Sequence, residues 1–353
     1  MEFLLDYGLF LAKIVTVVVA VVAILIIAKS VGGKSGAPKG ELEITNLTEQ
    51  HQHTVEQLEH HLYDDAFLKA RNKAEKKDEK EKHKAREKEI KKAAKDGELE
   101  SKRESHLFVL DFKGSIDAKE VASLREEVTA ILAVACEGDE VLLRLESGGG
   151  MVHGYGLASS QLDRLKSAGL PLTISVDKVA ASGGYMMACI ADKIVSAPFA
   201  IVGSIGVIAQ IPNFHKVLKK YDIEYEQVTA GEFKRTLTMF GENTDKARDK
   251  FKQELEETHV LFKDFIRERR PELDLENVAT GEHWFGTQAL SLGLVDEIKT
   301  SDDLVVEACK DKTVLAIHYV EKKKITSKLA ALMGEAADNV LMKLIDRGQR
   351  PIV

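Results

Sequence analysis

The chain has 353 residues, more than the roughly 100–200 of a single domain, so its length predicts two units or one domain with appendages. Hydrophobic residues make up 44% and charged residues 30%, which excludes a wholly disordered protein. Fifty Lys and Arg against 57 Asp and Glu give a net charge of −7, so the charge balance argues against a nucleic-acid partner. The three cysteines lie far apart and indicate neither a disulfide framework nor a zinc site.

The amino-terminal region contains a long apolar stretch. Residues 14–28 read IVTVVVAVVAILIIA, and residues 8–13 extend the stretch past about 20 residues, enough for a helix to cross a bilayer. A cleaved secretory signal needs a basic start, whereas Glu2 and Asp6 precede the apolar stretch here. Residues 1–30 are therefore predicted to be an uncleaved membrane anchor, with the lipid bilayer as a partner.

Residues 31–105 are predicted to be a charged connector. Between residues 66 and 105 there are fifteen Lys or Arg and ten Asp or Glu, with almost no large apolar side chain. Such a composition favours a solvated spacer, helical or disordered, over contact with anionic lipid headgroups. Four histidines at the start of the connector lack the spacing of a metal-ligand set, so no metal site is expected there: His51, His53, His60 and His61.

From residue 106 onward the pattern is that of an α/β domain. Short apolar runs alternate with amphipathic stretches, which is typical of parallel βαβ units. Strands are predicted at 107–112, 140–145, 172–176 and 193–196, with extended structure at 201–208, and helices at 117–136, 154–168 and 245–270. The domain is expected to span 106–300. Within 301–353, a strand at 313–320 and an amphipathic helix at 325–347 are expected to serve core packing or an oligomer contact, with membrane-interface binding as the alternative.

Two glycine-rich turns follow predicted strands. Ser147-Gly-Gly-Gly150 can bring backbone N–H groups close to a ligand, although a tight strand–helix turn explains the sequence equally well. It is neither a Walker loop nor a dinucleotide turn, so no nucleotide cofactor is predicted.

The second turn places Ser182 between Ala-Ala and Gly-Gly, just before a predicted helix. A serine in that place is commonly an N-cap, but it can also be a nucleophile beside backbone N–H groups. His153, His215, His283 and Lys234 are candidate bases; none of the histidines has a recognisable setting, and a lone lysine is ordinarily a solvated surface residue.

Several separated stretches together resemble the signal peptide peptidase A family of serine–lysine proteases, and its SohB branch most closely. These stretches are Ser147-Gly-Gly-Gly150, Ala181-Ser-Gly-Gly-Tyr185, Gly203-Ser-Ile-Gly-Val207, Gly231-Glu-Phe-Lys234, Gly281–Ala289 and Leu292–Asp296. They cover about residues 106–300 in the family's order, which is far more specific than any one of them. The chain departs from the family's usual Ser-Pro-Gly-Gly at Gly148.

The resemblance implies a serine endopeptidase with Ser182 as nucleophile, Lys234 as general base and Ser204 orienting the base. The N–H groups of Gly183 and of Gly149 or Gly150 would form the oxyanion hole, with no metal and no other cofactor. A lysine base must be neutral, which burial favours by making the ammonium form costly. The resemblance also implies a crotonase/Clp-protease-like spiral of βαβ units assembled into a homo-oligomeric ring, in which the base and the nucleophile can face each other across a subunit boundary.

The expected location is a bacterial inner membrane, with a single anchor. Flanking lysines favour a cytoplasmic catalytic domain, whereas the resemblance favours the periplasm, which is the side predicted. Peptides with small or apolar residues at the cleavage site, as in remnant signal peptides or misfolded envelope polypeptides, are the expected substrates. The alternatives are a catalytically silent membrane scaffold and a crotonase-like acyl-CoA enzyme, which needs no serine–lysine pair.

Overall fold

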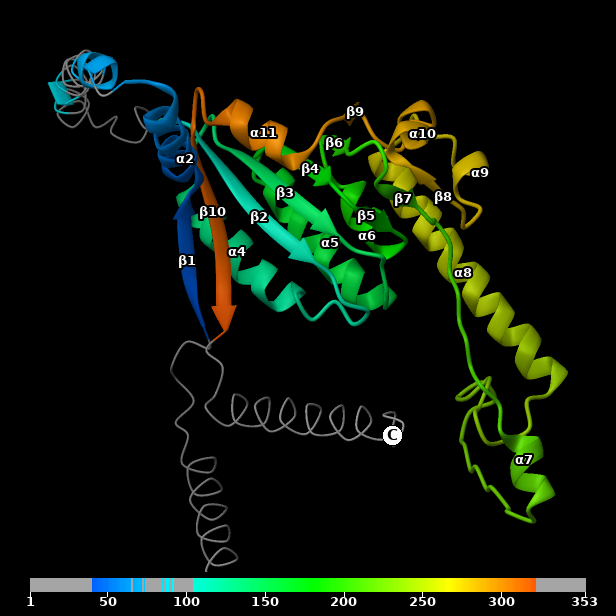
Figure 1. The fold of residues 1–353 in the computed structure, drawn as a ribbon. Helices are drawn as coiled ribbons and strands as arrows, with labels where there is room; N and C mark the ends of the chain where they lie inside the picture. Colours follow the sequence, from blue (N-terminus) through cyan, green and yellow to red (C-terminus); the bar gives the residue numbers. More distant parts are fainter. Residues whose placement is uncertain are drawn as a thin grey trace, which may run out of the picture. The chain divides into compact units, whose positions relative to one another are not determined.

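The computed structural model describes residues 40–64, 66–71, 73, 84, 87, 88, 91 and 104–321. Residues 42–320 form one compact unit, built on a seven-stranded sheet of order β1-β10-β2-β3-β4-β6-β9 and a three-stranded sheet of order β5-β7-β8 (Figure 1). Neighbouring strands from β10 to β9 pair in parallel, whereas β7 and β8 are antiparallel. The smaller sheet is therefore mixed, because β5 and β7 are parallel. The predicted α/β class is confirmed; the crotonase-like spiral stays a prediction.

The strands of the larger sheet are β1 (Gly40–Asn46), β2 (His106–Lys113), β3 (Glu140–Glu146), β4 (Leu172–Val176), β6 (Lys193–Ser196), β9 (Glu297–Ile298) and β10 (Thr313–Glu321). The smaller sheet contains β5 (Val179–Ala181), β7 (Ile201–Gly203) and β8 (His283–Phe285). The helices are α2 (Leu47–Leu62), α4 (Val121–Val134), α5 (Val152–Ser167), α6 (Gly183–Ala188), α7 (His215–Lys220), α8 (Asp245–Arg269), α9 (Leu275–Val278), α10 (Gly286–Ser291) and α11 (Ser301–Ala308).

The main core lies between one face of the large sheet and the helices that follow its strands. Alternate residues of β2, Phe108, Leu110 and Phe112, point into this core together with Leu124 of α4 and Leu162 of α5. Full burial of a large apolar side chain contributes about 1.5–3 kcal/mol, so this layer supplies much of the folding free energy.

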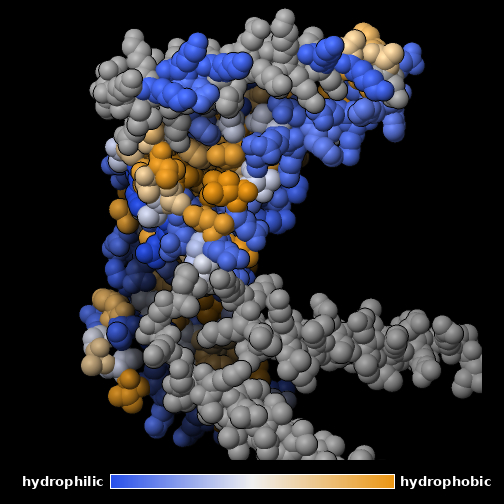
Figure 2. Space-filling view, turned by 90° about the vertical axis from the view of Figure 1, so that its left-hand side faces the viewer, coloured by the Kyte–Doolittle hydropathy of each residue, from blue (hydrophilic) through white to orange (hydrophobic). Residues whose placement is uncertain are grey.

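The opposite face of the sheet carries a smaller apolar cluster, against which α2 and α11 pack. Leu107 and Val109 belong to this cluster and alternate with the residues that face the main core. At the edge of the sheet, β1 leaves Leu42 and Ile44 exposed. Figure 2 shows the side of the molecule on which this edge lies, where hydrophobic surface gathers among hydrophilic surface.

The beginning of the expected connector differs from the prediction. Residues 40–46 form an edge strand of the large sheet, and residues 47–62 form α2, so this part of the chain is neither disordered nor wholly helical. Thr48 shows how this segment is attached, because its hydroxyl accepts a hydrogen bond from the backbone N–H of Val314 at 2.9 Å. Most side chains of residues 40–46 are exposed at the edge of the sheet, so this strand lacks a continuous apolar run.

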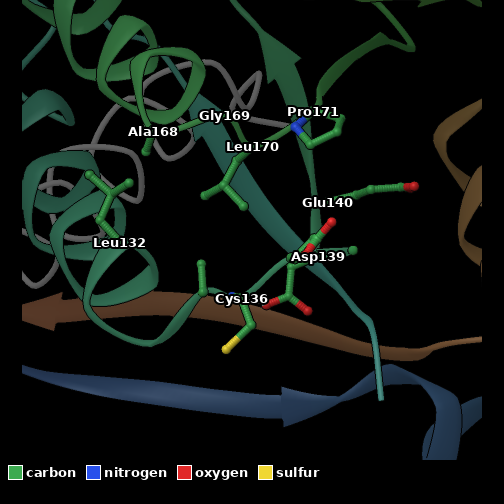
Figure 3. Close-up of a pocket in the computed structure, with 11 residues that line it drawn as sticks. Leu132, Cys136, Asp139, Glu140, Ala168, Gly169, Leu170 and Pro171 are labelled. Atoms are coloured by element: carbon green, nitrogen blue, oxygen red, sulfur yellow. Dashed lines mark hydrogen bonds between the residues drawn. The ribbon is translucent and has the colours of Figure 1, made fainter. Parts of the chain in front are cut away.

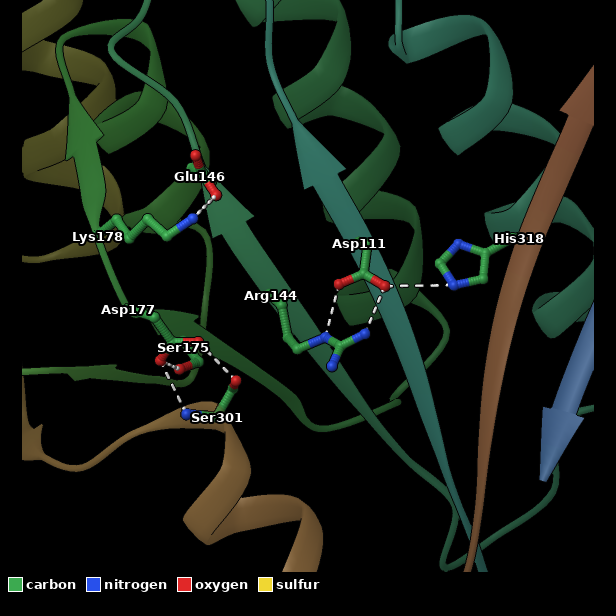
Figure 4. Close-up of polar contacts among 8 residues, drawn as sticks. All are labelled: Asp111, Arg144, Glu146, Ser175, Asp177, Lys178, Ser301 and His318. Carbon is green, nitrogen blue, oxygen red and sulfur yellow. Dashed lines mark hydrogen bonds and ion pairs between the residues drawn. The ribbon is translucent and has the colours of Figure 1, made fainter. Parts of the chain in front are cut away.

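On the face of the sheet that carries the smaller apolar cluster, charged and polar side chains lie toward the carboxyl ends of the strands (Figure 4). Arg144 of β3 donates two hydrogen bonds of 2.6 Å to Asp111 of β2, which also lies 3.3 Å from His318 of β10. Asp177 accepts hydrogen bonds from the backbone N–H and the hydroxyl of Ser301 and thereby holds the start of α11. These contacts tie neighbouring strands together where no apolar layer covers them.

Glu127 of α4 is a buried carboxyl that holds the end of β10. Its side chain accepts a 2.8 Å hydrogen bond from the backbone N–H of Tyr319. Burial raises the pKa of Glu127 to about 7, the Tyr319 N–H opposes that rise, and the negative charge of Asp111 adds to it. The folded state therefore holds this proton more tightly than the unfolded chain, so the contribution of Glu127 favours folding below about pH 4.5 and is lost as the pH rises through about 7.

Glu127→Gln should therefore stabilise the protein more at pH 8 than at pH 5. The amide oxygen can still accept from Tyr319, while the cost of a buried charge, at most about 3 kcal/mol, disappears. Thermal unfolding at both pH values checks this, with the exposed Glu126→Gln as the matched control. An equal change in melting temperature at both pH values would contradict the assignment.

Among the residues that the structure describes, no helix is long and apolar enough to cross a membrane. The apolar stretch at 14–28 and the predicted helix at 325–347 lie outside the described residues, so both stay predictions.

Candidate active site

Ser182 lies on a strained turn between β5 and α6. Its φ of 52° and ψ of −116° place a residue with a side chain in a region that normally favours glycine, at a cost of about 1–3 kcal/mol. The surrounding structure holds this conformation: the Ser182 N–H donates to the Gly203 carbonyl at 2.8 Å, and the Ser182 carbonyl accepts from Met186 N–H at 3.0 Å. The side chain is half-buried at the start of α6, where the first N–H groups have no partner within the helix.

Ser204 occupies the corresponding turn after the neighbouring strand. Because β5 and β7 are parallel and Ala181 is paired with Gly203, the two serines follow their strands at the same end of the small sheet. Ser204 also has a positive φ, of 50°, and its N–H donates to the carbonyl of Glu282 at 2.6 Å. The fold thus places the predicted nucleophile beside Ser204, the residue predicted to orient the base.

The glycine turn at residues 147–150 lies against the same place. Ser147 pairs with Ala180 of β5, and its carbonyl accepts from the Ala181 N–H at 3.0 Å. Gly149 has a φ of +82°, and a Cβ placed on it would lie 2.6 Å from the Gly183 nitrogen and 2.8 Å from the Ser182 Cβ. Only glycine permits this close approach of the two turns.

A chain of hydrogen bonds runs beneath the glycine turn. The Gly149 N–H donates to Ser147 Oγ at 3.1 Å, Ser147 Oγ lies 2.5 Å from Tyr155 Oη, and the Tyr155 hydroxyl donates to the Ser115 carbonyl at 2.8 Å. Tyr155 is fully buried, and burial raises the pKa of its hydroxyl; the Ser147 hydrogen bond opposes the rise, and Glu120 and Asp117 add to it. Tyr155 therefore keeps the proton that it donates.

The closing motif reaches the site through β8. This strand pairs with β7 so that Val202 lies opposite Trp284 and Gly203 opposite His283. The Trp284 ring would lie 2.9 Å from a Cβ at position 203, which explains glycine there. Four of the motif stretches named above, from residues 147, 181, 203 and 281, therefore meet at one place.

Lys234 belongs to a different part of the unit. It is exposed, and it lines a hollow of about 890 Å³ formed by residues 210–240, which includes neither Ser182 nor Ser204. Within the described residues, the hydrogen-bond and ion-pair partners of residues 231–241 lie in the same segment, at residues 213, 214 and 243, or in α8. The predicted base and the predicted nucleophile are therefore not assembled within one chain.

Another hollow, of about 470 Å³, lies at the opposite end of β3 from the glycine turn (Figure 3). It is lined near the ends of α4 and α5 and the starts of β3 and β4, by residues that include Leu132, Asp139, Glu140, Leu170 and Pro171. Since Ser147 follows the other end of β3, this hollow is not part of the serine site. Over the described ranges, no three or more His, Cys, Asp or Glu side chains are grouped to hold a metal ion.

Comparison with known proteins places the chain in a family. Residues 2–162 match peptidase family S49 N-terminal, and residues 164–315 match peptidase family S49. The probable protease SohB of Haemophilus influenzae is 53% identical over 350 residues, which cover 99% of this chain and 98% of that protein. The chain belongs to peptidase family S49.

Other members extend the comparison. The probable protease SohB of Buchnera aphidicola subsp. Acyrthosiphon pisum is 52% identical over 345 residues, covering 98% of each chain. Protease 4 of H. influenzae is 29% identical over 170 residues, which cover 48% of this chain and 28% of that protein. The resemblance inferred from the motifs is confirmed, and this S49 member is a protease, a hydrolase that acts on peptide or protein substrates.

Tyr155 and the side chain of Ser147 lie directly beneath the glycine turn, and the motifs gave neither of them a role. One signal was present, since Gly154 and Gly156 flank Tyr155 inside a helix, and glycine is unfavourable in helix interiors. A Cβ at Gly154 would lie 3.0 Å from the Asp117 carbonyl oxygen, so the first turn of α5 packs closely on the loop before α4. Because the helix and the loop pack this closely, the neighbouring Tyr155 is buried between them and the sheet.

Proposed function

We propose that the chain is a serine endopeptidase with a Ser182–Lys234 dyad. The observation that carries the proposal is the convergence of four motif stretches around Ser182, a half-buried serine held at a φ of 52° at the start of a helix. Strain of this kind is concentrated at functional sites, because folding does not otherwise maintain it.

In the proposed reaction, Ser182 Oγ attacks the carbonyl carbon of the peptide bond while its proton passes to the neutral amine of Lys234. The tetrahedral intermediate collapses to an acyl-enzyme, and the lysine returns the proton to the leaving amine. Water then attacks the ester by the same proton transfers, which releases the second product and restores the serine. Ser204, one strand away, would orient the lysine amine, and no cofactor takes part.

The oxyanion hole is assigned to Gly183 and Gly150. The N–H of Gly183 opens α6, and such first-turn N–H groups are available to an anion. The Gly149 N–H is bonded to Ser147 Oγ, so the choice between Gly149 and Gly150 falls on Gly150 as the second donor. Gly149 contributes its close approach to Ser182 instead.

The base is proposed to come from a neighbouring subunit of a homo-oligomeric ring. A lysine that acts as a base must be neutral, and burial against another subunit would favour the neutral amine. Around Lys234 the segment exposes many apolar side chains, which indicates a protein contact. They include Ile208, Ile211, Phe214, Val228, Phe233, Met239 and Phe240, with Val228 95% exposed.

Residues 1–30 are proposed to anchor the enzyme in a bacterial inner membrane, with the catalytic domain in the periplasm. The apolar stretch at 14–28, in which Thr16 is the only polar side chain, supports this proposal. A membrane-bound protease of this kind would act on remnant signal peptides or on misfolded envelope polypeptides. Residues 31–39 would then link the anchor to β1, the edge strand of the protease domain.

Hydrolysis of a fluorogenic peptide by the detergent-solubilised full chain tests the function. Ser182→Ala should abolish turnover and labelling by a fluorophosphonate, because both need the serine oxygen as nucleophile. Ser160→Ala is the matched control, since Ser160 is an exposed serine that donates to the Gly156 carbonyl. Equal hydrolysis by wild type and Ser182→Ala would reject the nucleophile and favour the scaffold alternative.

A further inference from the structure

The hydrogen-bond chain beneath the glycine turn has a fixed direction. A carbonyl oxygen can only accept, so the Tyr155 O–H, which lies 2.8 Å from the Ser115 carbonyl, is the donor there. A hydroxyl has a single hydrogen, so Ser147 must be the donor in its 2.5 Å contact with Tyr155. The Ser147 oxygen is then left to accept from the Gly149 N–H at 3.1 Å. Every group in the chain is satisfied in only this arrangement.

Two glycines lie directly against this hydrogen-bond chain. A Cβ added to Gly114 would lie 2.5 Å from Tyr155 Oη and 2.8 Å from Ser147 Oγ, and one added to Gly183 would lie 2.5 Å from the Tyr155 ring. Tyr155 is fully buried and Ser147 is 2% exposed, so water cannot replace a missing partner. In such a site an unsatisfied polar group carries its full desolvation cost, which a shift of the turn would relieve.

We propose that Tyr155 is a positioning residue for the hydrolytic reaction, acting through Ser147 on the glycine turn. Because this hydrogen-bond chain ties the Gly149 N–H to Ser147, it sets the orientation of the next peptide group. The N–H of that group belongs to Gly150 and is the proposed oxyanion donor. The Tyr155 ring also supports Gly183, the other proposed donor, from beneath. One side chain thus fixes both halves of the oxyanion hole relative to Ser182. This inference rests on the proposed function and assigns a residue to it that touches no substrate.

Tyr155→Phe keeps the ring and removes the hydroxyl, leaving Ser147 without an acceptor. The turn should relax, and kcat for the fluorogenic peptide should fall about tenfold to a hundredfold, since displaced oxyanion donors act mainly on the transition state. KM should change less than about twofold, because a donor needed only in the transition state contributes little to substrate binding. Ser147→Ala should lower kcat similarly, and the double variant should fall no further, because the same chain is already broken.

The matched control is Ser159→Ala, one helical turn further along α5. Ser159 is fully buried and its hydroxyl donates to the Met186 carbonyl of α6 at 3.1 Å, but it does not contact the glycine turn. Both substitutions remove a buried hydroxyl and should lower the melting temperature; only Tyr155→Phe should lower kcat.

The outcomes separate the two proposals. If Ser182→Ala is as active as wild type, the proposed function and this inference both fall. Two results would overturn the positioning role alone, provided that activity depends on Ser182. In the first, Tyr155→Phe has the same kcat as the control Ser159→Ala. In the second, the effects of Tyr155→Phe and Ser147→Ala on kcat simply add in the double variant. Should Tyr155→Phe fail to fold, Ser147→Ala against Ser159→Ala gives the same comparison.

Discussion

Co-expression of Lys234→Ala with Ser182→Ala should restore peptide hydrolysis that neither variant shows alone. Lys234→Ala by itself should lower kcat by about 10²–10⁴-fold, the usual contribution of general acid–base catalysis. Lys234→Arg should be equally inactive, because a guanidinium keeps the charge but does not give up its proton. Lys219→Ala, at an exposed lysine of α7, should leave the activity unaffected.

The restoration follows from the separation of Lys234 and Ser182 within one chain. If each site takes Ser182 from one subunit and Lys234 from its neighbour, an equal random mixture makes about a quarter of the sites complete. The matched control is Lys234→Ala co-expressed with the double variant Ser182→Ala/Lys234→Ala, which supplies no lysine and should stay inactive. A mixture that remains inactive while oligomer size is unchanged would place both groups of the site in the same subunit.

The sequence predicted the part of the fold that depends on local patterns. Alternating apolar runs located β2, β3, β4 and β6 to within a few residues, and the predicted helix at 245–270 corresponds to α8. The strand β1 was missed because its edge position leaves most of GELEITN exposed, so the run has no continuous apolar signal. Pairing partners distant in sequence, such as β10 beside β2, are set by the tertiary fold and leave no local trace.

For the site, the motifs predicted which residues react but not how these residues are held. The positive φ of Ser182 and Ser204 comes from strand pairing and loop contacts, which a pattern does not reveal for residues other than glycine. Likewise, the motif Gly231-Glu-Phe-Lys234 does not reveal that Lys234 lines a hollow without Ser182, although exposure is ordinary for a lone lysine. The motif alone leaves Gly149 and Gly150 as equal candidates for the second oxyanion donor. Only the hydrogen bond from the Gly149 N–H to Ser147 distinguishes them.

Gly150→Ala should inactivate the enzyme, whereas Gly148→Ala should not. A Cβ at position 150 would lie 2.0 Å from the carbonyl oxygen of Ile116 and 2.7 Å from its carbon, both of them backbone atoms. The Met151 N–H donates to the same carbonyl at 2.8 Å, so the turn cannot shift without breaking this bond. Overpacking of this kind costs about 1–3 kcal/mol of unfolding free energy.

The loss of activity should exceed the loss of stability, because the displaced peptide carries the proposed donor. Removing one oxyanion donor lowers kcat by about 10²–10³-fold, and a moved donor is equivalent to a missing one. Gly148 is the internal control: it lies two residues earlier in the same turn, has a φ outside the left-handed region, and has no atom within 4 Å of an added Cβ. Steady-state kinetics and thermal unfolding of both variants measure the difference. A wild-type kcat in Gly150→Ala would show that Gly150 is not an oxyanion donor. Comparable losses of kcat in Gly150→Ala and Gly148→Ala would show that the turn tolerates no added side chain, whichever peptide it displaces.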